Sequence, residues 1–536
     1  MRYWVSDALT AWKRDARPPE EPQMACAVET VQNARESMQV VLAAGEAFTL
    51  QGVRVNGLDA LAPEVRLQRF ETYTDGSVWP DALMPFASIA VPKDTVQSVW
   101  VTFGTAAGTP PGTYAGTVML ITDDGLTEVP VTVTVHPICL PDAGQATYSV
   151  EYWVSLTGFW WRSPEAEQQR DFIREQYGIE RYTPAWWSFA AHVRDVMKQN
   201  RINVLYVRTQ DLLAAGDTAR DADGQWRFDF SVLDRFVRLF LEGGGTKWLA
   251  GFHLIQQTEA RFVHTVGKGP DGLNRIEDVP LGSAEADAWL DQFLPALWAH
   301  LKDMGWDSLW LQHIEDEPAD AAPWRYGRAF VRRHMPGVRC LDAVDNQRPA
   351  PGLQNAMDLW VPRTDIYEEN RAFYDHRQRV GEERWAYTCC VPNTPNWLNK
   401  FTDRPVFHSR LLGWACFALG FTGFLHWGFN YWDTNDVWFG MRPDAFFKGD
   451  GYIVYPDRAR QALLETARLD ATRGAAEDYE LLRMLAERDA ALAYTLAGSV
   501  VRSFRDFTWD TQAIMRARSR VLAALAEHMR REAAQG

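Results

Sequence analysis

Two patterns of apolar residues divide the chain near residue 140. In the first part the apolar runs are short, rich in β-branched residues and bounded by Gly, Pro or Asp, most clearly at 38–54, 98–104 and 129–135. Runs of this kind without a helical period are typical of strands. Residues 109–135 also predict a hairpin, because Pro-Pro-Gly bends the chain before one run and Asp124-Gly125 turns it into the next. We predict an all-β domain over 1–140.

Beyond this boundary, short apolar runs alternate with amphipathic segments of helical period. The runs predict buried strands at 148–154, 202–207, 248–254, 308–314, 339–343, 358–361, 385–390 and 423–428. Helices are predicted between them, most clearly at 188–200, 229–243, 284–304 and 321–335. Strands interleaved with helices in this way predict a (β/α)8 TIM-type barrel over 141–485. The Ala-, Leu- and Arg-rich residues 486–536 predict a C-terminal helical extension packed on the barrel.

Composition narrows the function. The 536 residues are 46% apolar and 23% charged, which is typical of folded globular domains and excludes one small binding module. The formal charge of -15 repels phosphate backbones and anionic lipids, so we expect no nucleic-acid partner and no membrane partner. The N-terminal residues lack the apolar core of a secretory signal, which favours a cytoplasmic protein. The oligomeric state stays open, a homo-oligomer included.

The sequence does not contain the common metal and cofactor signatures. The six cysteines include no C-x-x-C pair, and the eleven histidines form no spaced cluster. The patterns H-E-x-x-H, G-x-S-x-G and the P-loop do not occur. We therefore predict no metal and no cofactor. His253 and His313 both fall at predicted strand ends, where they either line a pocket or pack in the core.

Three consecutive acids follow one of the predicted strands. In the segment SLWLQHIEDEPADAAPW (308–324), the apolar run ends in the acids 315–317, and Pro318 then prevents further strand pairing. Function collects at the carboxyl ends of the strands in a parallel barrel. Carboxylates crowded among apolar neighbours repel one another, which raises a pKa and keeps one acid protonated for general acid catalysis. The alternative is an acidic N-cap for the helix that follows.

Aromatic residues gather near two further strand ends. Trp is frequent, at 24 residues, and its flat apolar face suits the C–H faces of sugar rings. The segment 420–456 mixes such rings with amides and acids, namely His426, Trp427, Asn430, Tyr431, Trp432, Asp433, Asn435, Asp436 and Trp438. A third group surrounds the end of the strand at 385–390 and contains Tyr387, Asn396 and Trp397. These mixtures are suited to binding sugars, although part of the aromatics will serve core packing.

Taken in order, these segments resemble a known family. The all-β start, the barrel, I-E-D-E-P at 314–318, Y-T-C-C-V-P at 387–392 and G-F-L-H-W-G-F-N-Y-W at 423–432 are similar to the catalytic domain of glycoside hydrolase family 123. G-D-G-Y-I-V-Y-P at 449–456 continues the resemblance. The family consists of β-N-acetylgalactosaminidases. The stretches ARESMQVVLAA and PPGTYAGTV look like the β-sandwich that precedes the barrel in such proteins, so the resemblance implies a β-sandwich over 1–140.

The resemblance also implies a mechanism. A retaining exo-β-N-acetylgalactosaminidase of this family uses substrate-assisted catalysis, in which the sugar's 2-acetamido carbonyl attacks the anomeric carbon and an oxazoline-like intermediate forms. Asp316 would then orient the acetamido group, and Glu317 would protonate the leaving oxygen and later activate water. The partner is an oligosaccharide or glycoconjugate substrate. The family motif implies sugar binding near Trp427, Asn430, Tyr431 and Trp432, and position alone adds His253, Glu315, Tyr367, Tyr387, Asn396 and Trp397.

Two other functions fit the same residues. A barrel glycosidase for sugars without an acetamido group would pair Glu317 as the acid with a carboxylate nucleophile from another strand, such as Glu368 or Glu369. A non-catalytic carbohydrate-binding protein would keep the aromatic residues without the chemistry. The adjacent acids Asp316 and Glu317 argue against the second alternative, because binding alone does not require them.

Overall fold

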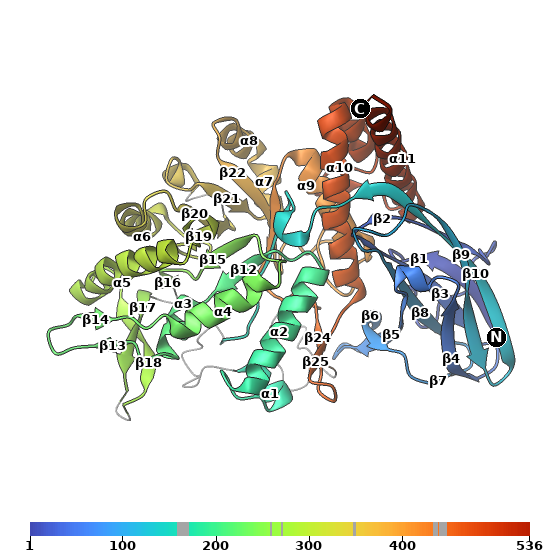
Figure 1. Ribbon diagram of the computed structural model, residues 1–536, viewed down its shortest axis with the longest axis horizontal. Helices are drawn as coiled ribbons and strands as arrows, with labels where there is room; N and C mark the ends of the chain where they lie inside the picture. Colours follow the sequence, from blue (N-terminus) through green and yellow to red (C-terminus); the bar gives the residue numbers. More distant parts are fainter. Residues whose placement is uncertain are drawn as a thin grey trace. The chain divides into compact units, whose positions relative to one another are not determined.

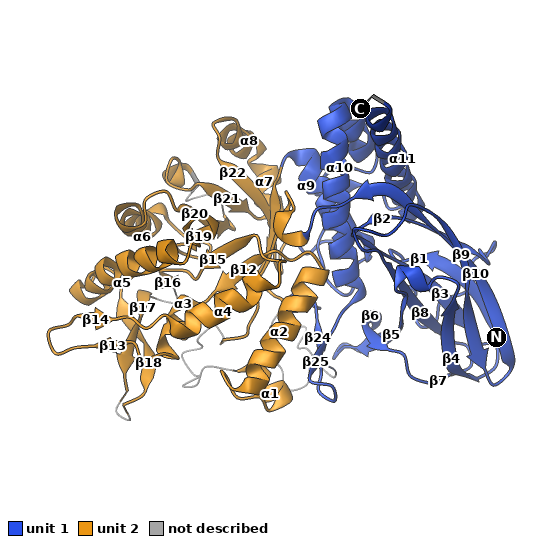
Figure 2. Cartoon of the chain, viewed as in Figure 1, with its two compact units in different colours: residues 1–142, 392–420, 432–536 blue, residues 143–391, 421–431 orange. Residues whose placement is uncertain are grey.

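Two compact units make up the chain (Figure 2). The computed structural model describes residues 1–157, 171–257, 260–269, 272–346, 350–432, 438 and 448–535. Unit 1 comprises residues 1–142, 392–420 and 432–536, and unit 2 comprises residues 143–391 and 421–431. The chain therefore passes between the two units four times.

Unit 1 contains a β-sandwich of two five-stranded sheets (Figure 1). One sheet has the order β1-β3-β8-β5-β6 and the other has the order β2-β10-β9-β4-β7. Neighbouring strands are antiparallel except for β10 and β2. The strands are β1 (Arg2–Asp7), β2 (Cys26–Gln32), β3 (Arg35–Ala43), β4 (Phe48–Asn56), β5 (Glu64–Thr72), β6 (Val78–Pro85), β7 (Ile89–Val91), β8 (Val96–Gly104), β9 (Gly112–Thr122) and β10 (Gly125–Cys139).

Alternation of apolar and polar residues decides which face of each sheet is buried. In β10, the side chains of Val129, Val131, Val133 and Val135 are buried, and the residues between them are exposed or partly exposed. These valines belong to one apolar core that takes residues from both sheets. The predicted hairpin is present, with β9 and β10 pairing from Thr122 and Gly125 at the turn.

The remaining elements of unit 1 come from the later part of the chain. They are three helices and two short hairpins: α9 (Phe407–Leu419), α10 (Ala467–Gly498), α11 (Thr511–Gln535), β24 (Tyr455–Asp457), β25 (Ala462–Leu464), β26 (Val501–Ser503) and β27 (Asp506–Phe507). Helix α10 packs against α9 and α11, and α11 contacts β10. The structure thus groups the C-terminal helices with the sandwich, whereas the sequence suggested packing on the barrel.

Unit 2 is built around a closed barrel of eight parallel strands in the order in which they occur along the chain. All neighbouring pairs are parallel, including the pair that closes the barrel, β11 with β23. The strands are β11 (Ser149–Tyr152), β12 (Val204–Val207), β15 (Trp248–Gly251), β19 (Trp310–His313), β20 (Arg339–Val344), β21 (Leu359–Pro362), β22 (Glu383–Thr388) and β23 (Gly423–His426). These confirm the predicted (β/α)8 fold, preceded by a β-rich domain.

Helices and a small inserted sheet accompany the barrel strands of unit 2 (Figure 1). The helices are α1 (Phe172–Tyr177), α2 (Pro184–Gln199), α3 (Thr209–Ala214), α4 (Ser231–Glu242), α5 (Ala284–Asp303), α6 (Ala321–His334), α7 (Thr364–Glu369) and α8 (Arg371–Arg379). Side-chain caps begin several of them, as where Ser283 accepts the backbone N–H of Ala286 at the start of α5. Short strands lie between the barrel strands: β13 (Ala219–Arg220), β14 (Trp226–Arg227), β16 (Gln256–Gln257), β17 (Arg261–Lys268) and β18 (Asn274–Pro280).

Crossing a bilayer requires a long helix that is apolar along its length. Within the part of the chain that the structure describes, no helix combines that length with that apolar character.

Candidate active site

The three predicted acids lie directly after β19, at the carboxyl end of the barrel. The strand ends at His313, and Glu315 makes a last isolated parallel bridge with Ile255. Glu317 then adopts a backbone φ of 44°, in the left-handed region that residues with a side chain rarely occupy, and Pro318 follows. This turn ends the strand pairing, so the side chains of Asp316 and Glu317 are no longer held on opposite faces of a sheet.

The first acid of the triplet is bound within the protein. The side chain of Glu315 is fully buried and its Oε1 accepts from Arg261 Nε at 2.5 Å, on the inserted strand β17. Burial raises the pKa of Glu315 to about 7, and the Arg261 guanidinium opposes that rise. Glu315 therefore anchors the inserted strand β17 to the end of β19. Its contacts within the protein do not add support to the prediction that Glu315 binds substrate.

The other two acids have the electrostatics of a general acid site. Burial raises the pKa of Asp316 well above its ordinary value, and the charges of Glu317 and Asp342 add to the rise. Burial also raises the pKa of Glu317 to about 7, with a further contribution from Asp345. A hydrogen bond from the Tyr387 hydroxyl to Glu317 acts in the opposite direction. At neutral pH this pair holds at least one proton that it can donate.

Neighbouring segments fix the backbone of the acid pair. Gln257 Nε2 on β16 donates to the carbonyl oxygens of Asp316 at 3.2 Å and Glu317 at 3.4 Å. The side chain of Asp316 is 23% exposed, so it reaches solvent while most of its surface is covered. Its Oδ1 atom has no hydrogen-bond partner among the described residues. The backbone of the pair is therefore held by β16, while part of the Asp316 side chain stays open to solvent.

A chain of buried polar side chains lies beside the acid pair, and most of it was not predicted. Asp342 on β20 accepts from His313 Nδ1 at 2.8 Å, and His313 Nε2 lies 3.3 Å from Glu151 on β11. Tyr206 on β12 contacts His253 Nδ1 at 2.8 Å, and His253 Nε2 lies 4.0 Å from Asp316 Oδ1. The signal in the sequence was a carboxylate inside an apolar run, in YSVEYWV and RCLDA, where a charge is expensive unless it is paired.

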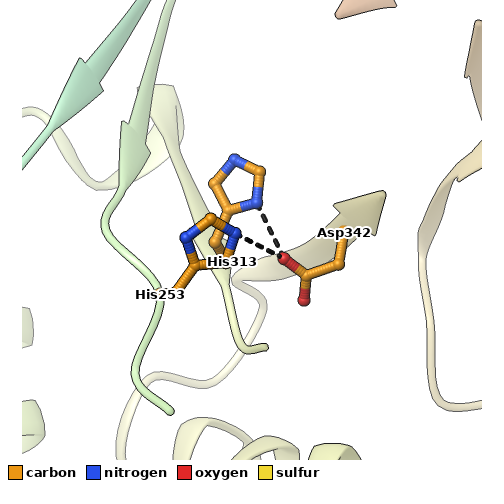
Figure 3. Close-up of side chains that lie close together, drawn as sticks. All are labelled: His253, His313 and Asp342. Carbon is orange, nitrogen blue, oxygen red and sulfur yellow. Dashed lines mark hydrogen bonds and ion pairs between the residues drawn. The ribbon is translucent and has the colours of Figure 1, made fainter. Parts of the chain in front are cut away.

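His253, His313 and Asp342 each offer one atom that could ligate a metal, and these atoms lie within 4.8 Å of one another (Figure 3). The two imidazole nitrogens face the same oxygen, Asp342 Oδ1, at 3.2 Å for His253 and 2.8 Å for His313. Burial lowers the pKa of His253 to about 4, whereas Glu151 and Asp342 overcome burial and raise that of His313 to about 10. A proton on His313 accounts for the short contact with Asp342, so the group is suited to hydrogen bonding.

The residues of the aromatic motif after β23 make two kinds of contact, ring packing and hydrogen bonds to the backbone. Trp427 and Tyr431 pack edge to face, with ring centroids 5.1 Å apart, and each keeps a small exposed surface of 7% and 9%. Asn430 is buried and bridges the backbone of Ser155, accepting from its N–H at 2.8 Å and donating to its carbonyl at 3.2 Å. Trp427 and Tyr431 therefore remain candidates for stacking on a sugar, while the Asn430 amide fixes the segment after β11.

Several other predicted residues have contacts within their own unit. Tyr367 on α7 is fully buried and donates to Asp375 Oδ1 at 3.1 Å, so it packs in the interior of unit 2. Asn396, Trp397 and Trp432 belong to unit 1, where Trp432 donates to the carbonyl of Val454 at 3.0 Å. The predicted residues Asp433, Asn435 and Asp436 lie outside the described residues.

The carboxylates beside Glu317 differ from those proposed for a two-carboxylate mechanism. Glu368 and Glu369 lie on the last turn of α7, and Glu369 is exposed. Asp345 follows β20 instead, is 29% exposed, and lies 3.8 Å from Arg363. It is close enough for its charge to raise the pKa of Glu317. Asp345 also follows a predicted strand, at 339–343, but it was missed because a single acid outside an acidic or aromatic cluster does not stand out in the sequence.

An acid pair with raised pKa values at the carboxyl end of a closed (β/α)8 barrel is an arrangement typical of a barrel glycoside hydrolase. Comparison with protein families agrees: residues 168–485 match the family model described as glycoside hydrolase 123, catalytic domain. The chain belongs to this family. The same comparison confirms the predicted resemblance.

Comparison with one solved structure supports the fold. A family 123 glycoside hydrolase from Clostridium perfringens, whose structure details glycolipid glycan hydrolysis, aligns with a TM-score of 0.77 and 13% identity over 99% of both chains. A β-glucuronidase from Parabacteroides merdae aligns at 8% identity over 79% of this chain and 47% of its own, with a TM-score of 0.27. A family 5 glycoside hydrolase from Bacteroides vulgatus aligns at 10% identity over 60% of this chain and 66% of its own, with a TM-score of 0.31. No curated protein matches the chain.

Proposed function

We propose that this glycoside hydrolase is a retaining exo-β-N-acetylgalactosaminidase that acts by substrate-assisted hydrolysis. The observation that carries the proposal is the adjacency of Asp316 and Glu317 at the end of β19, with the pKa values of both carboxyl groups raised by burial. Two consecutive acids can reach two neighbouring groups of one sugar. The 2-acetamido group and the glycosidic oxygen are two such groups, since they lie on adjacent ring carbons.

The two acids divide the reaction between them. Glu317 donates its proton to the glycosidic oxygen as the bond to the anomeric carbon breaks, while the acetamido carbonyl oxygen of the sugar forms the new bond. Asp316 accepts the acetamido N–H, which orients the carbonyl and stabilises the positive charge that develops on the amide. Glu317, now a carboxylate, takes a proton from the water that opens the oxazoline ring. The hydrogen bond from the Tyr387 hydroxyl holds the Glu317 side chain in place during these steps.

A glycan on a lipid or protein is the substrate class we propose. The Clostridium perfringens relative is described in connection with glycolipid glycans. Trp427 and Tyr431 each keep a small exposed surface, and we expect this surface to contact the apolar C–H face of a galactose-type ring. Both rings follow the strand β23, which closes the barrel beside β11.

The position of Asp345 favours one second candidate, a double displacement on a sugar without an acetamido group. Asp345 and Glu317 follow adjacent strands, β20 and β19, and their charges interact. In that mechanism Asp345 would attack the anomeric carbon and form a covalent glycosyl intermediate, with Glu317 as the acid and then the base.

A panel of 4-nitrophenyl glycosides distinguishes these functions. Substrate-assisted hydrolysis predicts cleavage of the β-GalNAc glycoside, no cleavage of the β-galactoside, and inhibition by a GalNAc-thiazoline. The Asp345→Asn variant keeps measurable β-GalNAc activity in this case, because the nucleophile belongs to the substrate. Cleavage of the β-galactoside by the wild type, together with loss of that activity in Asp345→Asn, would replace the proposal with the double displacement.

A further inference from the structure

The carboxylate of Asp342 is a point where hydrogen bonds from three parts of the barrel meet. Its Oδ2 accepts from the backbone N–H groups of Ile314 at 2.8 Å and Glu315 at 3.1 Å, and from Trp324 Nε1 on α6 at 2.6 Å. Asp342 is fully buried, so each of these donors depends on it and has no water to replace it. The two backbone groups belong to the residues immediately before the acid pair.

The other oxygen of Asp342, Oδ1, is held by His313, whose second ring nitrogen contacts Glu151. Oδ1 faces His313 Nδ1 and His253 Nε2, as Figure 3 shows. His313 is fully buried between Asp342 and Glu151, and both carboxylates favour its protonated form. Trp153 Nε1 donates to Glu151 Oε1 at 3.1 Å, which fixes the far end. Glu151, His313 and Asp342 thus form a connected chain from β11 through β19 to β20.

The connected side chains of Glu151, His313 and Asp342 act on the direction in which the acid pair points. A one-residue turn with φ of 44° aims Glu317, so a small shift of the backbone at residues 314–315 changes where both acids point. Gln257 on the short strand β16 also holds the backbone of the acid pair, by donating to the carbonyl oxygens of Asp316 and Glu317. Misplacement of a reacting group by about 1 Å costs on the order of 100-fold in rate, so fixing this backbone has catalytic value.

We propose that Asp342, clamped by the Glu151–His313 pair, is a positioning residue that fixes the backbone of Ile314 and Glu315 and thereby aims Asp316 and Glu317. The inference rests on the proposed role of these two acids as the catalytic pair. It assigns no contact with substrate to Asp342, His313 or Glu151, all of which are fully buried.

The test compares Asp342→Asn with a matched control. Asp358→Asn is the control, because Asp358 also accepts a backbone N–H of β20, from Cys340 at 2.8 Å, but lies at the opposite end of that strand. For Asp342→Asn we expect kcat on an alkyl glycoside to fall about 100-fold, and kcat on the matching dinitrophenyl glycoside to fall at least tenfold less. A dinitrophenolate leaves without a proton from Glu317, whereas an unfolded fraction would lower both rates equally.

The sugar used is whichever one the wild type cleaves in the glycoside panel, so failure of the proposed specificity does not decide this test. Equal loss on both leaving groups, or wild-type rates in Asp342→Asn, would overturn the positioning role. If Asp342→Asn does not fold, Glu151→Gln tests the same chain, because it removes the charge that holds His313 while keeping an acceptor.

Two further measurements do not need activity. A crystal structure of Asp342→Asn should show the backbone of residues 314–317 displaced, and an unchanged backbone would contradict the proposal. Metal analysis of the purified wild type should give less than stoichiometric transition metal. One bound zinc per chain that is lost on substitution of His313 would reassign His253, His313 and Asp342 as ligands.

Discussion

Glu317 combines two conditions that a side chain rarely meets together, a positive φ and a position before proline. The left-handed conformation costs a residue with a side chain about 1 kcal/mol or more, and proline restricts the residue before it further. The protein holds this conformation through the bonds around the neighbouring backbone. Strain of this kind is typical of positions where the direction of one side chain matters more than local stability.

The pH dependence of activity tests the state of Glu317. Its pKa of about 7 predicts that kcat/KM falls as the pH rises above neutrality, because the general acid must carry a proton. Tyr387→Phe removes a hydrogen bond that stabilises the Glu317 carboxylate, so the fall should move to higher pH. The measurement is the pH profile of kcat/KM on an unactivated glycoside. Tyr374→Phe, which removes another buried hydroxyl of unit 2, should leave the profile in place; a shift to lower pH in Tyr387→Phe would contradict this assignment.

Part of the candidate site was predictable from single residues. The acids 315–317 followed an apolar run and preceded a proline, and this pattern located the strand end correctly. Asp342 and Glu151 were missed because a carboxylate inside an apolar run indicates a buried charge without indicating its partner. Only the fold shows that His313 lies between them. Tyr367 shows the opposite difficulty. An aromatic residue near a strand end can pack in the core or bind a ligand, the sequence does not distinguish the two, and Tyr367 is fully buried.

At the scale of elements, the eight barrel strands could be predicted because each is a short, largely buried apolar run, and amphipathic helices separate most of them. The observed strands agree with the predicted runs to within a few residues. The short strands β16, β17 and β18 were not predicted, because they form a local sheet whose exposed positions break the apolar alternation. This insertion supplies Arg261 and Gln257 to the acid triplet.

Closure of the barrel depends on a glycine in β23. Gly423 pairs with Trp385 of β22, and a Cβ atom at residue 423 would lie 2.6 Å from Trp385 Cδ1. Trp385 is fully buried and cannot move aside, so Gly423→Ala should lower the free energy of unfolding by about 1–3 kcal/mol. Urea unfolding measures the change. Gly498→Ala, where an added Cβ meets no atom within 4 Å, is the control; equal stability of both variants would show that β22 and β23 tolerate a wider spacing.

At the scale of the whole molecule, buried ion pairs connect distant segments of unit 1. Arg410 on α9 and Arg518 on α11 both contact Glu36 of β3, at 3.1 and 3.0 Å, and both contact Asp478 of α10. All four side chains are nearly inaccessible to solvent. Burial opposes ionisation of Glu36, but the two arginines lower its pKa to about 2. The C-terminal helix is thus part of the electrostatic core of the sandwich unit.

Removing Arg518 from this network leaves two buried carboxylates in contact with one arginine, Arg410. Arg518→Met should therefore destabilise the protein by about 3–5 kcal/mol at pH 7 in urea unfolding. The depressed pKa of Glu36 contributes stability above pH 4.5 that is lost as the pH falls toward 2, so the difference from the wild type should shrink over that range. Arg516→Met removes an exposed partner of Asp510 and should have little effect. A destabilisation that stays constant down to pH 2 would argue for lost packing instead of lost charge.

The repeated passage of the chain between the two units sets a schedule for folding during synthesis. The barrel cannot close until β23 has left the ribosome, because that strand joins β22 to β11. The sandwich strands emerge first but wait for α9, α10 and α11, whose arginines neutralise Glu36. The apolar core of the sandwich comes from residues 5–135 and can form early, but its buried ion-pair network is complete only after the barrel strands have been made. Both units reach their final state only after these later segments have been made, and until then Glu36 of the nascent sandwich lacks its arginine partners.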